Sequence, residues 1–407
     1  MLLFSDLVTE VKSMAIRDQG GTEFDSVIKN GINEAIFRIA RETPWKQLRR
    51  TTTFDTKTSY TTGTGAVTVT ASSKNVTVTG ATFLTDGIEV GRRISLGGSN
   101  LRYTIATITG ETTLTVDINY DGTTSSTQSY SILPKEEYAL AAQATQIGCL
   151  WHEAFGYPYV MQYVPNLEFL QSQTTMFYTA VPRYYREWNM DMVLRQPNAA
   201  SAVTIVSSSA SDTTPTVTVF GLVSSYPDQE TITLNGTTSA VGTKSFTTID
   251  RIVKNATTVG RVTATTNSAN VTIAVIPVGD GTAGIMYNKV RLWPLPSSVF
   301  PMNVWYYKQP WRLVNDQDVH ELGQEFDNAI VMLATAKIRY QNNQKEGDRF
   351  LSLYTDEIKS LKKSNGDKID FLNVLKRPEE SRGREAYLNP NLAFSQLGGY
   401  YGPSSYR

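Results

Sequence analysis

"VRLWPLPSSVFPMNVWYYKQPW", residues Val290–Trp311, decides how the rest of the chain is interpreted. Its four prolines exclude a regular helix, and its six aromatic residues make it too apolar for an ordinary loop. "YNKVRLW" and "MNVWYYK" are therefore predicted to be strands, with "PLPSSVFP" turning between them as in a hairpin. Proline is tolerated at turns and strand ends because no ladder N–H is lost there. The alternation predicts Met302, Val304 and Tyr306 on one face of the second strand.

A third strand is predicted earlier in the chain. The stretch "RYYREWNMDMVLR", Arg183–Arg195, has the aromatic and alternating character of a strand. Together the three strands predict a small antiparallel sheet, which residues 199–282 interrupt at the tip of a hairpin.

Helical patterns surround this sheet. Residues 1–55 show apolar residues at helical spacing up to Pro44, and residues 134–156 are predicted as a helix that Pro134 opens. Residues 326–361 are predicted as one long helix or two. The expected fold class is α+β. Its helical-bundle core is discontinuous and combines residues 1–55, 131–198 and 283–363.

Two regions switch to the period of β structure. Residues 56–130 alternate valine or isoleucine with threonine, and residues 199–282 contain short alternating runs such as "TVTVFGL". Asn235-Gly236 is a strong hairpin signal in the second region. Each region is expected to be an inserted, all-β, sandwich-like domain, because insertions succeed at exposed turns whose ends lie close together.

The last region, 364–407, shows neither helical nor strand periodicity and is rich in Gly, Pro, Asn and Ser. It is expected to be an extended C-terminal arm that orders only on assembly. Aromatic and leucine side chains recur along it like anchors, and aromatic residues are enriched at interface hot spots. The predicted interaction residues are Tyr387, Leu388, Phe394, Leu397, Tyr400 and Tyr401.

Composition limits the function. Lys+Arg and Asp+Glu both total 38, so the formal net charge is zero, which disfavours a general nucleic-acid or membrane-surface binder. The only cysteine, Cys149, cannot form an internal disulfide. Asp6 and Glu10 interrupt any signal-peptide core, and no apolar run has membrane-spanning length. We expect the protein to be made and folded in a cytosol.

The sequence shows no catalytic constellation. His152 is expected to be a partly exposed helix residue, and His320 to lie in a polar turn that leads into a helix. Asp316, Asp318 and Glu321 surround His320, but no second His/Cys cluster completes a metal site. Phosphate-binding, metalloprotease and nucleophile-elbow motifs are absent from the sequence. We therefore expect no enzyme activity, no catalytic or metal-binding residues and no cofactor.

Four stretches in order resemble the head-to-tail adaptor, or connector, proteins of short-tailed bacteriophages. "INEAIFRIARETPWKQL" is an amphipathic helix that ends in Pro-Trp, and "SYSILPKEEYAL" leads from a strand through Leu-Pro into a helix. The opening stretch is similar to the strand–Pro-x-Pro–strand hairpin of that family, and "FDNAIVMLATAKIRYQ" with "DRFLSLYTDEIKSLKK" to its closing helix. The β regions resemble immunoglobulin-like or similar insertions of phage structural proteins.

The resemblance implies a structural virion protein of the neck. Such proteins form a ring of about twelve copies that joins the portal protein of the head to a tail nozzle or tail-tube protein, and DNA passes through the lumen. A neutral chain suits a lumen that must not hold DNA tightly. The C-terminal arm is then expected to dock along a neighbouring subunit or the portal.

Two other readings of the sequence stay open at this point. A tail-fibre or surface-decoration protein would bind a receptor or glycan through its β modules. An enzyme with an unrecognised site is the third possibility. The amphipathic helices without sustained heptads favour the adaptor over the fibre.

Overall fold

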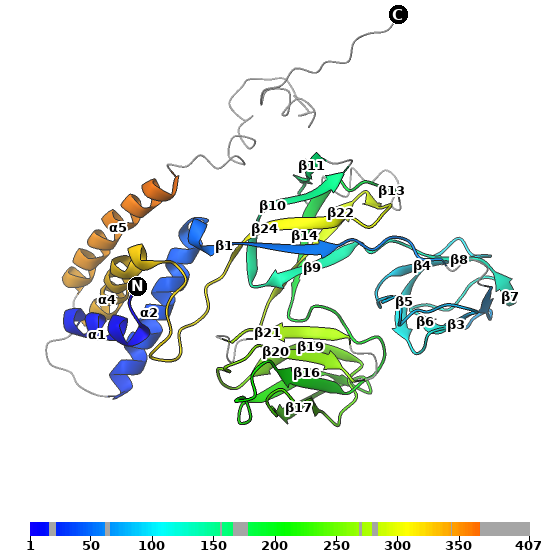
Figure 1. Cartoon of the computed structure of the whole chain (residues 1–407), viewed down its shortest axis with the longest axis horizontal. Coiled ribbons are helices and arrows are strands. Elements are labelled where there is room, and N and C mark those ends of the chain that lie inside the picture. Colours follow the sequence, from blue (N-terminus) through cyan, green and yellow to red (C-terminus); the bar gives the residue numbers. More distant parts are fainter. Residues whose placement is uncertain are drawn as a thin grey trace, which may run out of the picture. The chain divides into compact units, whose positions relative to one another are not determined.

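The computed structural model describes residues 1–15, 22–61, 66–154, 157–165, 178–267, 271–278, 284–342 and 344–366. Met1–Asn365 form one compact unit. Strands contain 40% of the residues and helices 22%, so the fold is mostly β (Figure 1). The predicted helical-bundle core is therefore wrong. The described residues in the middle of the chain form strands of separate sheets, not helices of a bundle.

The segment predicted as a helix over residues 134–156 holds strands β9 (Glu137–Ala142) and β10 (Ala144–Ala154). The register of β10 against β24 (Pro301–Lys308) shifts twice, between Ala144 and Gln146 and between Ile147 and Cys149. These bulges place buried side chains at Ala144, Ile147 and Leu150, three residues apart. That spacing imitates a helix, and long-range pairing overrides the local propensity of the segment.

A central β part is built from two sheets. One has the order β1-β24-β10-β11 and the other the order β12-β14-β22-β9. Their remaining strands are β1 (Arg49–Asp55), β11 (Tyr157–Val160), β12 (Gln162–Tyr163), β14 (Tyr184–Asp191) and β22 (Tyr287–Trp293). A short parallel pair joins β13 (Thr179–Ala180) to β23 (Leu295–Pro296). Buried side chains from both sheets form one core, which includes Tyr138, Leu140, Ile147, Leu150, Tyr185, Val290, Leu292, Met302, Val304 and Tyr306.

The stretch Val290–Trp311 supplies a strand to each of these sheets. β22 pairs antiparallel with β14 and β9, and β24 pairs antiparallel with β1 and β10. The two strands and the predicted face of Met302, Val304 and Tyr306 are confirmed, since all three side chains are buried. The hairpin is wrong, because β22 and β24 are neighbours in neither sheet. The proline-containing turn thus carries the chain from one sheet to the other.

Residues 67–132 form a β-barrel-like part rather than the predicted sandwich. Its seven strands have the order β7-β2-β3-β6-β5-β4-β8, and only Ser129 separates the two terminal strands of that order, so the sheet nearly closes on itself. The strands are β2 (Val67–Val69), β3 (Asn75–Val78), β4 (Arg93–Leu96), β5 (Arg102–Ile108), β6 (Thr113–Val116), β7 (Ser125–Gln128) and β8 (Tyr130–Ile132). The alternating valines and isoleucines fill its interior.

Residues 193–287 form a second β core, to which the side chains of two sheets contribute. One sheet has the order β18-β15-β20-β21 and the other β17-β16-β19. The strands are β15 (Val203–Ser207), β16 (Thr216–Val223), β17 (Tyr226–Thr233), β18 (Ala240–Val241), β19 (Thr248–Lys254), β20 (Val262–Thr266) and β21 (Thr272–Ile276). Gly236 has a φ of 58°, but the predicted Asn235-Gly236 hairpin does not join neighbouring strands, since β17 and β18, which flank it, lie in different sheets.

The helical part comprises residues 1–48 and 313–366 and therefore joins the two ends of the described chain. Its elements are α1 (Phe4–Ala15), α2 (Thr22–Glu42), η1 (Lys46–Leu48), η2 (Gln324–Phe326), α4 (Asp327–Asn342) and α5 (Gln344–Gly366). Trp45, just after Pro44, is almost fully buried; its ring lies edge-on to Phe326 at 4.8 Å between centroids, and its Nε1–H donates to the Ile39 carbonyl at 2.7 Å.

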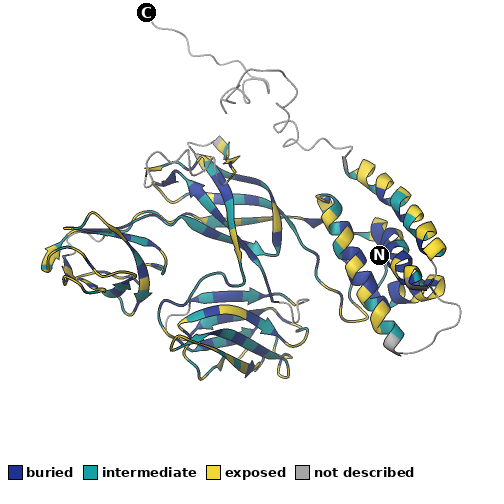
Figure 2. Ribbon diagram, turned by 180° about the vertical axis from the view of Figure 1, so that it is seen from behind, coloured by how far each residue is buried: buried dark blue, intermediate teal, exposed yellow. Residues whose placement is uncertain are grey.

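The last helical pattern forms two helices, and α5 runs back along the helical part. The Lys362 ammonium donates to the Glu42 carboxylate at 2.7 Å, and the Tyr354 hydroxyl bonds to the same carboxylate. Exposed residues run along one side of α5, while Tyr354 and Ile358 are buried (Figure 2). Among the residues that the structure describes, no helix combines the length and apolar character that a membrane crossing needs.

Candidate functional site

His152 lies in the core of the central β part. It belongs to β10 rather than to a helix, and its side chain is fully buried. Its Nε2 is 3.0 Å from the Pro182 carbonyl oxygen, and the rings of Tyr159 and Phe300 lie 5.3 and 5.2 Å from its own. The expectation of a partly exposed helix residue is wrong in both respects. The imidazole is packed as a core side chain.

His320 is also buried, next to the first residue of α4. Its Nε2 lies 2.5 Å from the Asp327 carboxylate, which also accepts the Leu2 N–H at 3.0 Å. Burial lowers the pKa of His320, and the bond to Asp327 only partly offsets this. The neutral imidazole therefore donates its Nε2–H to the carboxylate. This pair fastens the start of the chain to the start of α4.

The acidic residues around His320 serve separate partners. The Asp316 carboxylate accepts from the Lys29 ammonium at 2.7 Å, and Glu321 accepts from Lys308 at 2.6 Å. Asp318 accepts the N–H groups of Val314 and Asn315 at 2.7 and 2.8 Å. No group of three His, Cys, Asp or Glu side chains suited to a metal occurs among the described residues.

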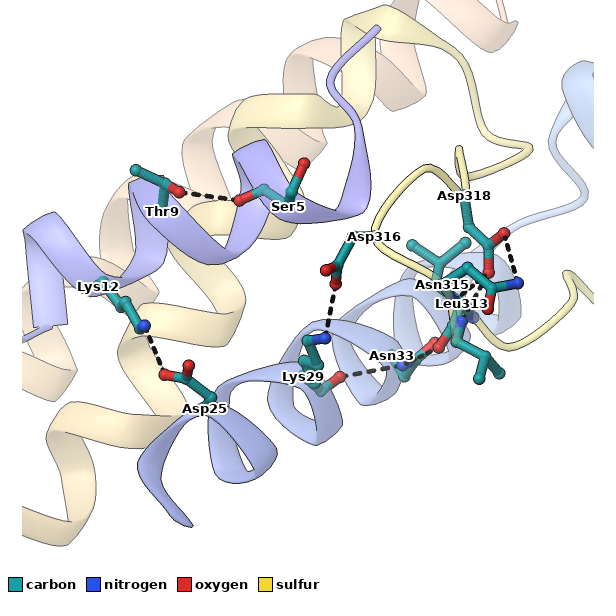
Figure 3. A network of polar contacts seen from close by, with 11 residues as sticks. Ser5, Thr9, Lys12, Asp25, Lys29, Asn33, Leu313, Asn315, Asp316 and Asp318 are labelled. Atoms are coloured by element: carbon teal, nitrogen blue, oxygen red, sulfur yellow. Dashed lines mark hydrogen bonds and ion pairs between the residues drawn. The ribbon is translucent and has the colours of Figure 1, made fainter. Parts of the chain in front are cut away.

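A polar network holds the same loop to α2, and the ion pair of Lys12 with Asp25 joins α1 to α2 (Figure 3). The side-chain amide of Asn33, which is 3% exposed, donates to the Leu313 carbonyl at 3.0 Å and accepts the Leu313 N–H at 2.7 Å. The Asp318 carbonyl accepts the Phe4 N–H at 2.8 Å. Because these bonds join residues far apart in sequence, they fix the position of α2 relative to the loop that leads to α4.

A groove of about 470 Å³ lies where α2, α4 and α5 come together, and we call it the helical groove. Its floor is made of small or apolar residues from all three helices: Gly31, Ala35, Leu333, Ala336 and Leu351. Its rim carries longer side chains: Glu34, Arg38, Lys337 and Tyr340. A floor of this kind suits apolar side chains rather than a charged ligand.

The charges at the rim are largely balanced against each other. Glu34 of α2 pairs with Lys337 of α4, and about half of each side chain is exposed. A second hollow of about 410 Å³ continues from Glu34 and Arg38 along α2 to Glu42. Burial acts to raise the pKa of Glu42, but hydrogen bonds from Lys362 and Tyr354 outweigh it and hold that pKa below its usual value. The groove thus has an apolar floor and a charged border, in which Glu34 and Lys337 form an ion pair and Arg38 adds a further positive charge.

The predicted interaction residues Tyr387, Leu388, Phe394, Leu397, Tyr400 and Tyr401 lie outside the described residues. The sequence did not indicate the groove, and Gly31 and Ala35 are both buried on α2. Their small size lets α2 and α4 approach closely, since a Cβ on Gly31 would lie 3.7 Å from the Ile338 side chain.

The chain matches no protein-family model, and no curated protein matches it.

Proposed function

We propose that this protein is a structural virion subunit that forms a ring between the portal of a bacteriophage head and its tail. The observation that carries the proposal is the helical groove, whose apolar lining and ion-paired border suit contact with another protein better than binding of a small charged ligand. The resemblance to adaptor proteins supports the same role. Its first and fourth stretches correspond to α2 with η1 and to α4 with α5, whereas the second leads into strand β9 instead of a helix and the third supplies β22 and β24 to two different sheets.

In this role the chain acts by binding rather than by catalysis. The portal protein lies on one side of the ring and a tail nozzle or tail-tube protein on the other, with DNA passing transiently through the lumen. The protein is made in the host cytoplasm and ends in the neck of the virion. A ring of about twelve copies follows the resemblance. The C-terminal arm docks through Tyr387, Leu388, Phe394, Leu397, Tyr400 and Tyr401.

The test is a count of copies in the assembled particle. Electron microscopy of portal-bearing heads, with and without this protein, should show a closed ring below the portal only when the protein is present. Free subunits are an unsuitable sample, because they can stay monomeric until a portal ring templates them. A monomeric or trimeric arrangement in the particle would refute the adaptor role.

The predominance of strands favours a second candidate, a tail-fibre or surface-decoration protein. In that role the β parts bind a receptor or a glycan, and the protein is expected to be trimeric or to stud the capsid. Binding of the purified chain to host cells, lost when a β part is deleted, would support this candidate. Attachment to portal-bearing heads that survives the same deletion supports the adaptor.

A further inference from the structure

We propose that two copies of this chain pair through the outer face of the sheet β1-β24-β10-β11, around a two-fold axis that sets β1 of one copy antiparallel to β1 of the other. The outer face consists of the side chains of β1, β24 and β10 that point away from the core of the central β part. This inference goes beyond the proposed ring and does not depend on it, because it concerns free chains before a portal is present.

The register of the strands arranges the outer face in rows. Residues directly opposite each other in an antiparallel pair lie on the same face of a sheet, and those of the outer face alternate with the buried residues of the core. Each row joins a residue of β1 to one of β24, and β10 adds a third side chain to three of the rows. The rows are Arg49–Tyr307–Gln146, Thr51–Trp305–Cys149, Thr53–Asn303–Trp151 and Asp55–Pro301.

The large side chains of the outer face are aromatic and only partly covered. Trp151, Trp305 and Tyr307 are all of intermediate exposure. The two tryptophan rings meet edge to face, with 5.5 Å between their centroids. The Arg49 guanidinium lies over the Trp305 ring, 4.4 Å from its centroid. Because Trp, Tyr and Arg are the residue types most enriched at interface hot spots, this face is suited to contact with a protein.

The charges of β1 make the outer face complementary to itself. Arg49 begins β1 and Asp55 ends it, and both side chains are exposed. They stand six residues apart, about 20 Å along the strand, which is too far for an ion pair within one chain. A two-fold axis that crosses the strands places Arg49 of each copy against Asp55 of the other. Two equivalent ion pairs then form, as a contact between identical surfaces requires, and they favour a second copy over a partner of uniform charge.

The same axis also sets large side chains against small ones. It exchanges the two middle rows, so Trp305 of one copy lies opposite Asn303 of the other. Trp151 likewise lies opposite Cys149, a small side chain that is 7% exposed. Each tryptophan therefore meets a smaller residue rather than a second tryptophan, and the side chains of two packed faces can interdigitate.

The dimensions of the outer face set the expected strength of pairing. The face measures about 20 Å along the strands and about 15 Å across the four strands. Contacts of this size are weak, so we expect a dissociation constant in the micromolar range. Sedimentation velocity of the full-length protein at concentrations from about 1 to about 200 µM covers that range.

Charge reversal tests the pairing. Arg49→Glu alone brings like charges together at both contacts, and so does Asp55→Arg alone. We expect either variant to raise the dissociation constant at least about tenfold. An equimolar mixture of the two variants regains both ion pairs, so it should form mixed dimers about as tightly as the unchanged chain. The control is Lys74→Glu, an exposed residue just before β3 in the barrel-like part, which should leave the dissociation constant unchanged.

Three results would overturn the inference: an unchanged chain that stays monomeric over the whole range, pairing that neither reversal weakens, or a mixture of folded variants that fails to regain it. Circular dichroism shows whether the variants are folded. A measurement without variants is salt dependence, since the dissociation constant of the unchanged chain should rise at least about threefold from about 50 to about 500 mM NaCl, and a constant value contradicts the ion pairs. Rings on portal-bearing heads without free dimers reject this contact alone, and free dimers without rings reject the adaptor role alone.

Discussion

Asn33 offers the sharpest test of how the helical part is held together. Replacing Asn33 by alanine removes the two bonds that its amide makes to the backbone of Leu313, at 2.7 and 3.0 Å. The Leu313 N–H and carbonyl would then be left without these partners in a buried place. Each buried group left unpaired costs about 1–3 kcal/mol, so the helical part should lose about 2–6 kcal/mol of stability.

The chain has several separate cores, so one unfolding temperature would not report the stability of the helical part alone. Hydrogen exchange measured by mass spectrometry reports each part separately and therefore suits this prediction. Amides of α2 and α4 should exchange at least about thirty-fold faster in Asn33→Ala, while those of the barrel-like part keep their rates. The control is Asn30→Ala, since Asn30 bonds to Arg312 at the exposed surface of the same helix. Equal exchange rates in the two variants would refute the structural role assigned to Asn33.

Three further predictions concern pH, the inserted β structure and the arm. Burial lowers the folded-state pKa of His320 below its ordinary value of 6.5, so the unfolded chain binds a proton more readily than the folded one. The stability that the neutral imidazole contributes should therefore be fully present above pH 6.5 and should decline as the pH falls below it. His320→Gln keeps a donor for Asp327 and should flatten this dependence in thermal melts; an unchanged slope contradicts it. The Lys135 N–H donates to the Lys57 carbonyl at 3.0 Å, so a Gly-Ser bridge in place of residues 58–134 should preserve the helical circular dichroism, and a loss of helicity would count against independent insertion. Truncation after Lys376 should abolish attachment to portal-bearing heads; full attachment by the shortened chain would show that the arm is dispensable.

The elements best predicted from the sequence are those whose local pattern and long-range partners agree. α2 ends before Pro44 as expected, and Val67, Val69, Val76 and Val78 are all buried, as their alternation indicates. In these segments the residues whose apolar spacing predicts burial are the residues that are buried in the structure. A single sequence is therefore enough to locate these elements.

The failures arise where the deciding information lies in a distant strand. β10 imitates a helix because two bulges reset its alternation, and only its pairing with β24 shows this. The turn at Pro294 and Pro296 was expected to close a hairpin, but the preferred partners of β22 and β24 are β14 and β1. Closure of the barrel-like sheet is likewise a property of strand order rather than of any one strand.

The candidate site likewise depends in part on residues that are distant in the sequence. Tyr387 and Phe394 are predicted as anchors from composition alone, because large aromatic residues in a polar tail are conspicuous, and they stay a prediction. The helical groove could not be predicted in this way, since it depends on the packing of three helices from opposite ends of the chain. Gly31 and Ala336 become neighbours only after that packing is complete.

Both ends of the described chain meet in the helical part, and this sets the order of events during synthesis. α1 and α2 leave the ribosome first, but Leu313, Phe326 and the rest of their packing partners follow some 265 residues later, counted from Leu48 to Leu313 (313 − 48). At about 5–20 residues per second this is a delay on the order of 15–50 s. The barrel-like part and the second β core can fold during that interval, while the apolar face of α2 waits uncovered. We therefore expect chaperones that shield nascent helices to raise the yield of folded protein.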